Sequence, residues 1–230
     1  MIENIKKITK AFKVDLDSRE NQNIILKPSA RPFKAHQVNE VAKKIYKLIE
    51  GAKHSNDDII LNHNKIKEAF FSPFEPQLKD AKVFLSHSHA DKNKVLKVKN
   101  YLESETNHRV FIDSLFWDYK DNVLNELAKY DDTSKIKDAF TLILRESLQD
   151  MIEKYPYFVF LQSNNSVSNQ GLSRTTYSAW IYEELKIAHS IRESRLTPMT
   201  EIWQVFHNIS PFLESLETIT LKKLSRIINS

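Results

Sequence analysis

The feature that most constrains the fold is a short apolar run, Val83-Phe84-Leu85, that stops at four polar residues, Ser86–His89. An apolar run of this length, with no polar alternation, is typical of a strand buried on both faces, as in a parallel sheet. A helical pattern follows from about Ala90-Asp91. Because ligands of open α/β sheets bind beyond the carboxyl ends of the strands, we expect Ser86–His89 to lie where a ligand would bind.

Strand and helix patterns alternate from residue 82 onward. This alternation predicts an α/β domain with a parallel sheet flanked by helices. Two further strands are predicted at Arg109–Ile112 and Tyr157–Leu161, and a last strand near Leu216–Thr220. The predicted helices are Lys92–Leu102, Asn122–Tyr130, Lys135–Glu153 and Ser178–Glu193. Ser114–Tyr119 and the polar stretch Gln162–Tyr177 are predicted to be loops.

The pattern of residues 1–80 differs from the rest and predicts a mainly helical extension. The α/β domain is then placed at 81–195, with a C-terminal segment, 196–230, that completes or packs on it. The elements predicted in the extension are an amphipathic helix, an extended connector and two further helices: Met1–Phe12, Asn23–Pro32, Gln37–Glu50 and Asn64–Phe71. A separate role in oligomerisation or partner sensing is the alternative to simple packing.

Composition excludes several classes of function. There is no cysteine, which excludes thiolate nucleophiles, disulfides and cysteine-ligated zinc. The only glycines, Gly51 and Gly171, cannot form a P-loop or a Rossmann fingerprint. No apolar run approaches the roughly 18 residues of a membrane span, and the N-terminus lacks a signal-peptide core, so we expect a cytoplasmic protein. A net charge of +4 is too small to indicate nucleic-acid binding.

The helix predicted over Ser178–Glu193 carries a carboxylate on its apolar face. On a helical wheel, one stripe is formed by Trp180, Ile181, Leu185, Ile187, Ala188 and Ile191. Glu184 falls in the middle of this stripe, whereas Glu183 falls outside it. A carboxylate facing a core is costly unless it is paired, neutral or lining a cavity. Glu184 is therefore a candidate functional acid, and the alternative is a structural carboxylate paired with an internal Arg or Lys.

Four segments in succession resemble the motifs of Toll/interleukin-1 receptor (TIR) domains, most closely bacterial members. They are VFLSHSHADK, VFIDS, FVFLQS and SAWIYEELKIA, and the likeness covers about residues 81–195, roughly half of the chain. The resemblance implies a flavodoxin-like α/β fold. It also implies cleavage of NAD at the nicotinamide–ribose bond, which many bacterial and plant members perform. The family's catalytic glutamate lies four residues after a helix tryptophan, and Glu184 stands in that position after Trp180.

The same resemblance suggests which residues bind the substrate. The expected residues are Ser86, His87, Ser88, Asp113, Ser114, Trp117 and Trp180. The first three match the segment that borders the NAD site, the next two match the start of the mobile BB loop, and either tryptophan could stack on a ring or close the pocket. The sequence departs from the family in two places. The BB-loop stretch Ser114–Asn122 lacks the Gly and Pro common there, and no fourth strand is evident soon after the glutamate helix.

A single carboxylate suits NAD cleavage. Nicotinamide is a cationic leaving group in NAD, so its departure needs no general acid. What needs help is the oxocarbenium-like charge on the ribose, which a carboxylate in a poorly hydrated site can stabilise. Ordinary glycosidases, by contrast, require two carboxylates. Capture by water gives ADP-ribose, and capture by another nucleophile gives a cyclic or conjugated ADP-ribose signal. NAD is then the substrate, and no cofactor is expected.

Other readings stay open. A TIR adaptor could act by TIR–TIR assembly without catalysis, and a deoxyribosyltransferase-like enzyme would act on nucleosides. His87 and His89 would share a face of a continuing strand, but no third ligand is evident and no metal is expected. By resemblance, the enzyme would serve a bacterial antiphage system of the Thoeris type. Its partners would be other TIR domains or further copies of itself, and a downstream effector that senses the nucleotide product.

Overall fold

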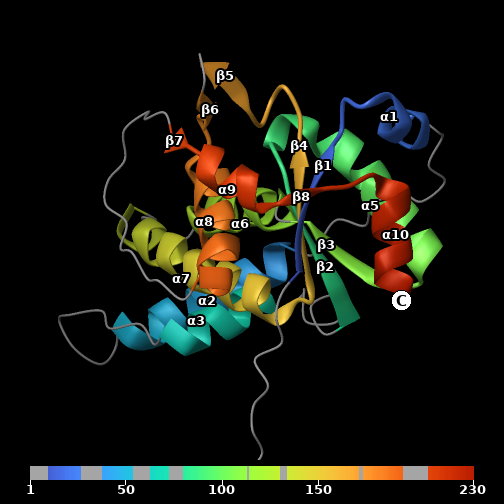
Figure 1. Cartoon of the computed structure of the whole chain (residues 1–230). Coiled ribbons are helices and arrows are strands. Elements are labelled where there is room, and N and C mark those ends of the chain that lie inside the picture. The colour runs from blue at the N-terminus through green and yellow to red at the C-terminus, as the bar shows by residue number, and fades with distance from the viewer. Residues whose placement is uncertain are drawn as a thin grey trace, which may run out of the picture. The chain divides into compact units, whose positions relative to one another are not determined.

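The computed structural model (Figure 1) describes residues 10–26, 38–53, 63–72, 80–112, 114–129, 134–170, 173–193 and 207–230. The chain divides into two compact units. The sheet unit comprises residues 1–31, 80–114 and 149–230, and the helical unit comprises residues 32–79 and 115–148. In the described ranges, no helix has the length and apolar character that crossing a membrane requires.

The sheet unit is built on a five-stranded parallel sheet flanked by helices, a flavodoxin-like α/β fold. Its strands are β1 (Lys10–Asp15), β2 (Ala81–Ser86), β3 (Arg109–Ile112), β4 (Tyr157–Gln162) and β8 (Glu217–Thr218). The spatial order is β3-β2-β4-β1-β8, and every neighbouring pair is parallel. The predicted fold class is confirmed, as are the three strands predicted from residues 82, 109 and 157. The strand predicted near residues 216–220 is β8.

β1 is the one strand of this five-stranded sheet that the sequence analysis did not predict. Flavodoxin-like sheets have the strand order 2-1-3-4-5, and β1 fills the fourth place, between β4 and β8. The helix predicted over Met1–Phe12 is wrong for residues 10–12, while residues 1–9 lie outside the described part. Residues 10–15 also belong to the sheet instead of a helical extension. Four consecutive side chains of β1, residues 11–14, are buried, as a central strand of a covered sheet requires.

Helices flank both faces of the sheet (Figure 1). They are α1 (Arg19–Ile25), α5 (Lys92–Thr106), α8 (Ala179–Glu193), α9 (Ser210–Ser215) and α10 (Leu221–Asn229), with a 3-10 turn, η1 (His89–Asp91), before α5. α1 and α10 pack against α5 over one face, whereas α8 and α9 pack together over the other. The helices predicted from residues 92 and 178 are confirmed. The connector predicted over Asn23–Pro32 instead begins inside α1.

The register aligns one row of side chains beneath α8. Ser86 of β2 lies opposite Phe160 of β4, which lies opposite Lys13 of β1. In the row below, the rings of Phe84 and Phe158 stack with their centroids 5.9 Å apart. Because side chains alternate between faces along a strand, all five of these side chains lie on one face of the sheet, which we call the α8 face.

A small antiparallel sheet stands where a loop was predicted over Gln162–Tyr177. It comprises β5 (Ser168–Gln170), β6 (Ser173–Thr176) and β7 (His207–Asn208), in the order β5-β6-β7. Thr175 and Thr176 are buried, and their β-branched side chains suit a strand. The polar composition of this stretch concealed a pairing that depends on residues 207–208, which lie much later in the chain.

The helical unit contains four helices or large parts of them. They are α2 (Val38–Lys53), α3 (His63–Phe71), most of α6 (Ser114–Leu127) and most of α7 (Ser134–Lys154). Phe70 packs edge-to-face against Tyr119 and Phe140, with ring centroids 5.0 and 5.4 Å away. The loop predicted over Ser114–Tyr119 is wrong because α6 already begins at Ser114. No glycine or proline in this stretch opposes a helix.

Candidate functional site

The candidate site lies at the carboxyl edge of the sheet, where β2 and β4 are neighbours. The chain proceeds from β2 to β3 on one side and then returns to β4 on the other side. Ser86 and Gln162 are the last residues of these two strands. A reversal of strand order of this kind is the topological switch point at which open α/β sheets bind their ligands.

Glu184 meets Ser86 at the switch point. The Ser86 hydroxyl donates a hydrogen bond to Oε2 of Glu184. Both residues are 0% exposed, and Ile181 and Leu185, on the same side of α8, are buried with them. Glu184 therefore faces the interior, as the helical wheel predicted. The structure thus joins two residues that sequence reasoning had selected separately, one from a strand end and one from a helix face.

More of the α8 surface is covered than the wheel predicted. Glu183, which the wheel placed outside the apolar stripe, is only 5% exposed. On α8, the Tyr182 ring stacks on His207 at 4.6 Å between centroids and contacts Phe212 at 5.6 Å. β7 and α9 therefore cover part of the helix surface that lies outside the apolar stripe. Trp180, in the first turn of α8, is half-buried.

The three residues after Ser86 differ in how exposed they are to solvent. His87 is buried, Ser88 is half-buried and His89 is exposed. β2 ends at Ser86 and η1 begins at His89, so the two histidines do not share a strand face. Within the part of the chain that the structure describes, no group of three or more His, Cys, Asp or Glu residues could hold a metal ion.

Three of the expected site residues follow β3 closely in the sequence. Asp113 lies outside the described residues. Ser114 and Trp117 stand in the first turn of α6, where only the backbone is described. The stretch matched to a BB loop is therefore helical from Ser114 onward. That these three residues bind the substrate stays a prediction.

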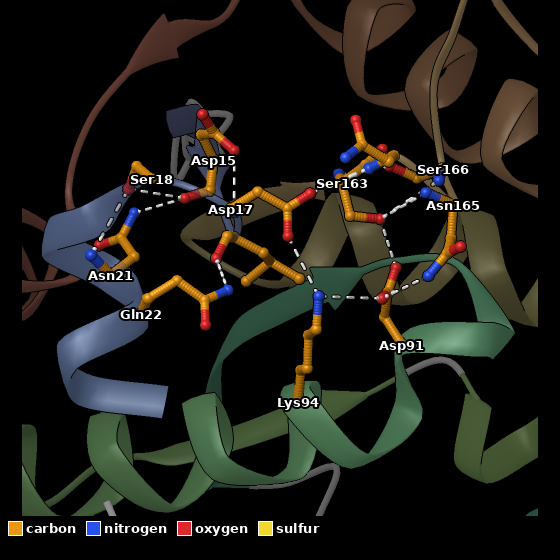
Figure 2. A network of polar contacts seen from close by, with 12 residues as sticks. Asp15, Asp17, Ser18, Asn21, Gln22, Asp91, Lys94, Ser163, Asn165 and Ser166 are labelled. Carbon is orange, nitrogen blue, oxygen red and sulfur yellow. Dashed lines mark hydrogen bonds and ion pairs between the residues drawn. The ribbon is translucent and has the colours of Figure 1, made fainter. Parts of the chain in front are cut away.

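A second buried carboxylate at the same edge, Asp91, was missed by the sequence analysis. It is 2% exposed and directly precedes α5, yet its side chain makes no capping hydrogen bond there. Its carboxylate instead accepts hydrogen bonds from the Ser163 hydroxyl and, at 2.8 Å, from the Asn165 amide (Figure 2). The Lys94 ammonium lies 3.8 Å from the carboxylate. The available signal in the sequence was an acid directly before a predicted helix, followed later by the Ser/Asn-rich stretch that ends the Tyr157–Leu161 run.

The polar contacts continue to the loop after β1 (Figure 2). The Lys94 ammonium also lies 3.1 Å from one carboxylate oxygen of Asp17, and the other oxygen accepts the Asn164 backbone N–H at 3.1 Å. The Asn21 amide donates to the Asp15 carbonyl at 2.7 Å. The loops that follow three adjacent strands, β2, β4 and β1, are therefore tied together. We call these contacts, centred on Asp91 and Lys94, the edge network.

The α8 face also holds a buried cation. Lys13 is 8% exposed, and its ammonium donates to the carbonyl of Leu213, in α9, at 3.3 Å. Burial and, secondarily, the nearby Arg174 cation lower the pKa of Lys13, while Asp15 and Glu214 oppose this shift. The interior beneath α8 and α9 thus contains groups of both charge signs, with Phe160 between the strands that carry Ser86 and Lys13.

Comparisons with known proteins identify no relative, because no family model, no curated protein and no solved structure matches this chain. The resemblance to TIR domains therefore stays a prediction from the sequence.

Proposed function

We propose that this protein cleaves NAD at the nicotinamide–ribose bond, with Glu184 as the catalytic carboxylate. The observation that carries the proposal is the position of this group. Glu184 is a fully buried carboxylate, hydrogen-bonded by the last residue of β2, at the switch point of a flavodoxin-like sheet. The TIR resemblance selects the same residue for a different reason, namely its spacing from Trp180.

The chemistry requires negative charge beside the ribose. When the C–N bond breaks, its electron pair leaves with nicotinamide, which departs neutral, and positive charge develops on the ribose. A carboxylate away from water stabilises that charge strongly because the surrounding dielectric is low. The Ser86 hydroxyl bond would hold the carboxylate in one orientation. Water then adds to the ribosyl cation and releases a proton to give ADP-ribose, or another nucleophile gives a cyclic or conjugated product.

The proposal requires a conformational step. Ser86 and Glu184 are 0% exposed, so NAD can reach them only after part of their cover has moved. Opening and closing of a site commonly precedes chemistry and can limit the rate. Since TIR domains act in assemblies, turnover should be followed over a wide range of protein concentration.

The test measures NAD loss and nicotinamide release by the wild-type protein, with products identified by mass. Glu184→Gln keeps the shape of the side chain but removes its charge, and we expect it to abolish turnover. Glu183→Gln is the matched control, because it makes the same change at the neighbouring buried glutamate of α8. Equal turnover by wild-type and Glu184→Gln proteins would mean that the catalytic group lies elsewhere.

Other outcomes would favour the alternatives. No turnover at any concentration would favour a non-catalytic adaptor that acts by assembly. Activity on free nucleosides would favour the deoxyribosyltransferase-like reading. In a cell, NAD cleavage would deplete NAD or supply an ADP-ribose-derived signal to an effector, and we propose antiphage defence as that setting on the strength of the TIR resemblance.

A further inference from the structure

A polar side chain with an unsatisfied atom lies next to the proposed site. The side-chain amide oxygen of Gln162, the last residue of β4, is buried, and no described residue donates a hydrogen bond to it. Buried acceptors without donors are costly and rare in native proteins. A polar residue at such a position therefore indicates a partner that binds from outside the chain.

The register places Gln162 close to the proposed catalytic pair. Phe160 lies opposite Ser86, so Gln162, two residues further along β4, projects from the same α8 face one layer nearer the carboxyl edge. With strands about 4.8 Å apart and a rise of about 3.3 Å per residue, the Cα atoms of Gln162 and Ser86 are separated by roughly 8 Å. A single small ring and its substituent span such a distance.

The backbone of Gln162 is fixed on both sides. Its carbonyl accepts the Leu16 backbone N–H at 2.8 Å, and Asp15 lies opposite it on β1. The next residue, Ser163, is anchored by its hydroxyl to Asp91 in the edge network (Figure 2). A backbone fixed in this way holds the origin of the Gln162 side chain in place, which reduces the conformational freedom that is lost when a donor binds.

We propose that Gln162 is a substrate-binding residue whose amide oxygen accepts a hydrogen bond from the carboxamide of the nicotinamide ring. This inference rests on the proposed cleavage of NAD. In this proposal nicotinamide lies on the outer side of Glu184, toward the carboxyl edge, from which it can depart after cleavage, and Gln162 stands on that side. The carboxamide carries the N–H donors of that part of the substrate. The ribose hydroxyls lie on the other side of the breaking bond, within reach of Glu184.

A specificity follows from this contact. In the acid analogue of NAD, a carboxylate replaces the carboxamide and offers no N–H donor. It would bring negative charge against the Gln162 oxygen. Sites built to receive a donor discriminate strongly against analogues that lack it. NAD should therefore bind better than its acid analogue, and the preference should depend on Gln162.

The experiment measures binding of NAD and of its acid analogue by calorimetry to the non-cleaving Glu184→Gln protein, with and without Gln162→Met. Methionine has a similar volume and leaves no amide oxygen. We expect Glu184→Gln to bind NAD at least tenfold more tightly than the acid analogue. Adding Gln162→Met should weaken NAD binding about tenfold or more, leave analogue binding unchanged and remove the preference. Asn164→Ala is the control, because its exposed side chain is removed while its backbone contact to Asp17 remains.

Thermal unfolding separates a binding role from a structural role. If the Gln162 oxygen serves the substrate, Gln162→Met should not lower the unfolding temperature, because it removes an unsatisfied buried acceptor. A lower unfolding temperature with equal weakening of both nucleotides would overturn the inference, and so would equal NAD affinity with and without Gln162→Met. Absence of NAD binding together with absence of wild-type turnover would overturn the proposed function itself.

Discussion

Two buried carboxylates at the same edge of the sheet, Asp91 and Glu184, differ in what surrounds them. Each accepts a hydrogen bond from a serine hydroxyl: Asp91 from Ser163, and Glu184 from Ser86. Asp91 also faces the Asn165 amide, from the loop after β4, and the Lys94 ammonium, from the first turn of α5, whereas Glu184 lies on α8 beside the buried apolar side chains of Ile181 and Leu185. Burial alone therefore does not distinguish the carboxylate proposed to be catalytic from one that fastens loops together. The origin and charge of its neighbours are the better guide.

The largest effect should come from neutralising Glu184. We expect Glu184→Gln to lower kcat/KM for NAD by at least about 10³-fold, because an amide cannot stabilise the positive charge on the ribose. The free energy of unfolding should change by less than about 1 kcal/mol, since glutamine keeps the volume of the side chain and an oxygen that can accept the Ser86 hydroxyl bond. Turnover assays and urea unfolding on the same preparations check both statements. A large loss of stability would instead give Glu184 the structural role.

Asp91 should show the reverse pattern. Asp91→Ala leaves the Ser163 hydroxyl, the Asn165 amide and Lys94 without their shared acceptor, and should lower the free energy of unfolding by about 3 kcal/mol. Asp91→Asn keeps an acceptor oxygen and should lose less. Well below the unfolding midpoint, both variants should retain kcat within about tenfold of wild type. If Asp91→Ala abolished turnover while remaining fully stable, the roles of the two carboxylates would have to be exchanged.

The two serines offer a matched pair of smaller changes. Ser86→Ala and Ser163→Ala each remove one hydroxyl donor to a buried carboxylate, and each should cost about 1–3 kcal/mol of stability. Only Ser86→Ala should also lower kcat, because only its partner is proposed to act on the substrate. Single-turnover measurements at saturating NAD would detect the difference. Equal kcat losses in both variants would show that the comparison between the two carboxylates is mistaken.

Lys94 should have the smallest effect. Its side chain is 38% exposed and that of Asp17 is 33% exposed, so the pair is largely screened by solvent. We expect Lys94→Ala to lower the free energy of unfolding by about 0–1 kcal/mol, and less at high salt. Urea unfolding at two ionic strengths measures this. A loss comparable to that of Asp91→Ala would mean that charge, more than the hydroxyl and amide donors, holds the edge network together.

The parts of the fold that were predicted from sequence carry their signal locally. Short apolar runs predict β2, β3 and β4, and helical periodicity predicts α5, α7 and α8. Both signals can be recognised without knowing which elements pack against them. β1 was missed because Phe12 also fits a helical spacing with Ile2, Ile5 and Ile8, and because its strand partners lie far away in sequence. The start of α6 was missed because Ser114–Tyr119 was predicted to be a loop, although this stretch has no glycine or proline that opposes a helix.

The site residues that were identified from the sequence also carry a local signal. Glu184 was identified by its place on one helix, and Ser86 by its place at one strand end. The contacts of Asp91 and the position of Gln162 beside the site depend on the register between β2, β4 and β1, and on the loops that follow those strands. No local pattern in the sequence specifies that register. Residues whose role depends on three separate segments are therefore visible only in the folded chain.

The place of β1 has a consequence for how the protein is made. β1 is synthesised before both of its neighbours in the sheet, and contacts such as Lys13 to Leu213 and Asn21 to Leu221 join residues 200 positions apart. Such separations raise contact order and slow folding, and an unpaired strand invites aggregation in the meantime. The sheet can therefore close only when β8 has left the ribosome, with a strand from the beginning of the sequence enclosed between later ones. We expect chaperone dependence during expression, and sensitivity to fusions placed directly before Lys10.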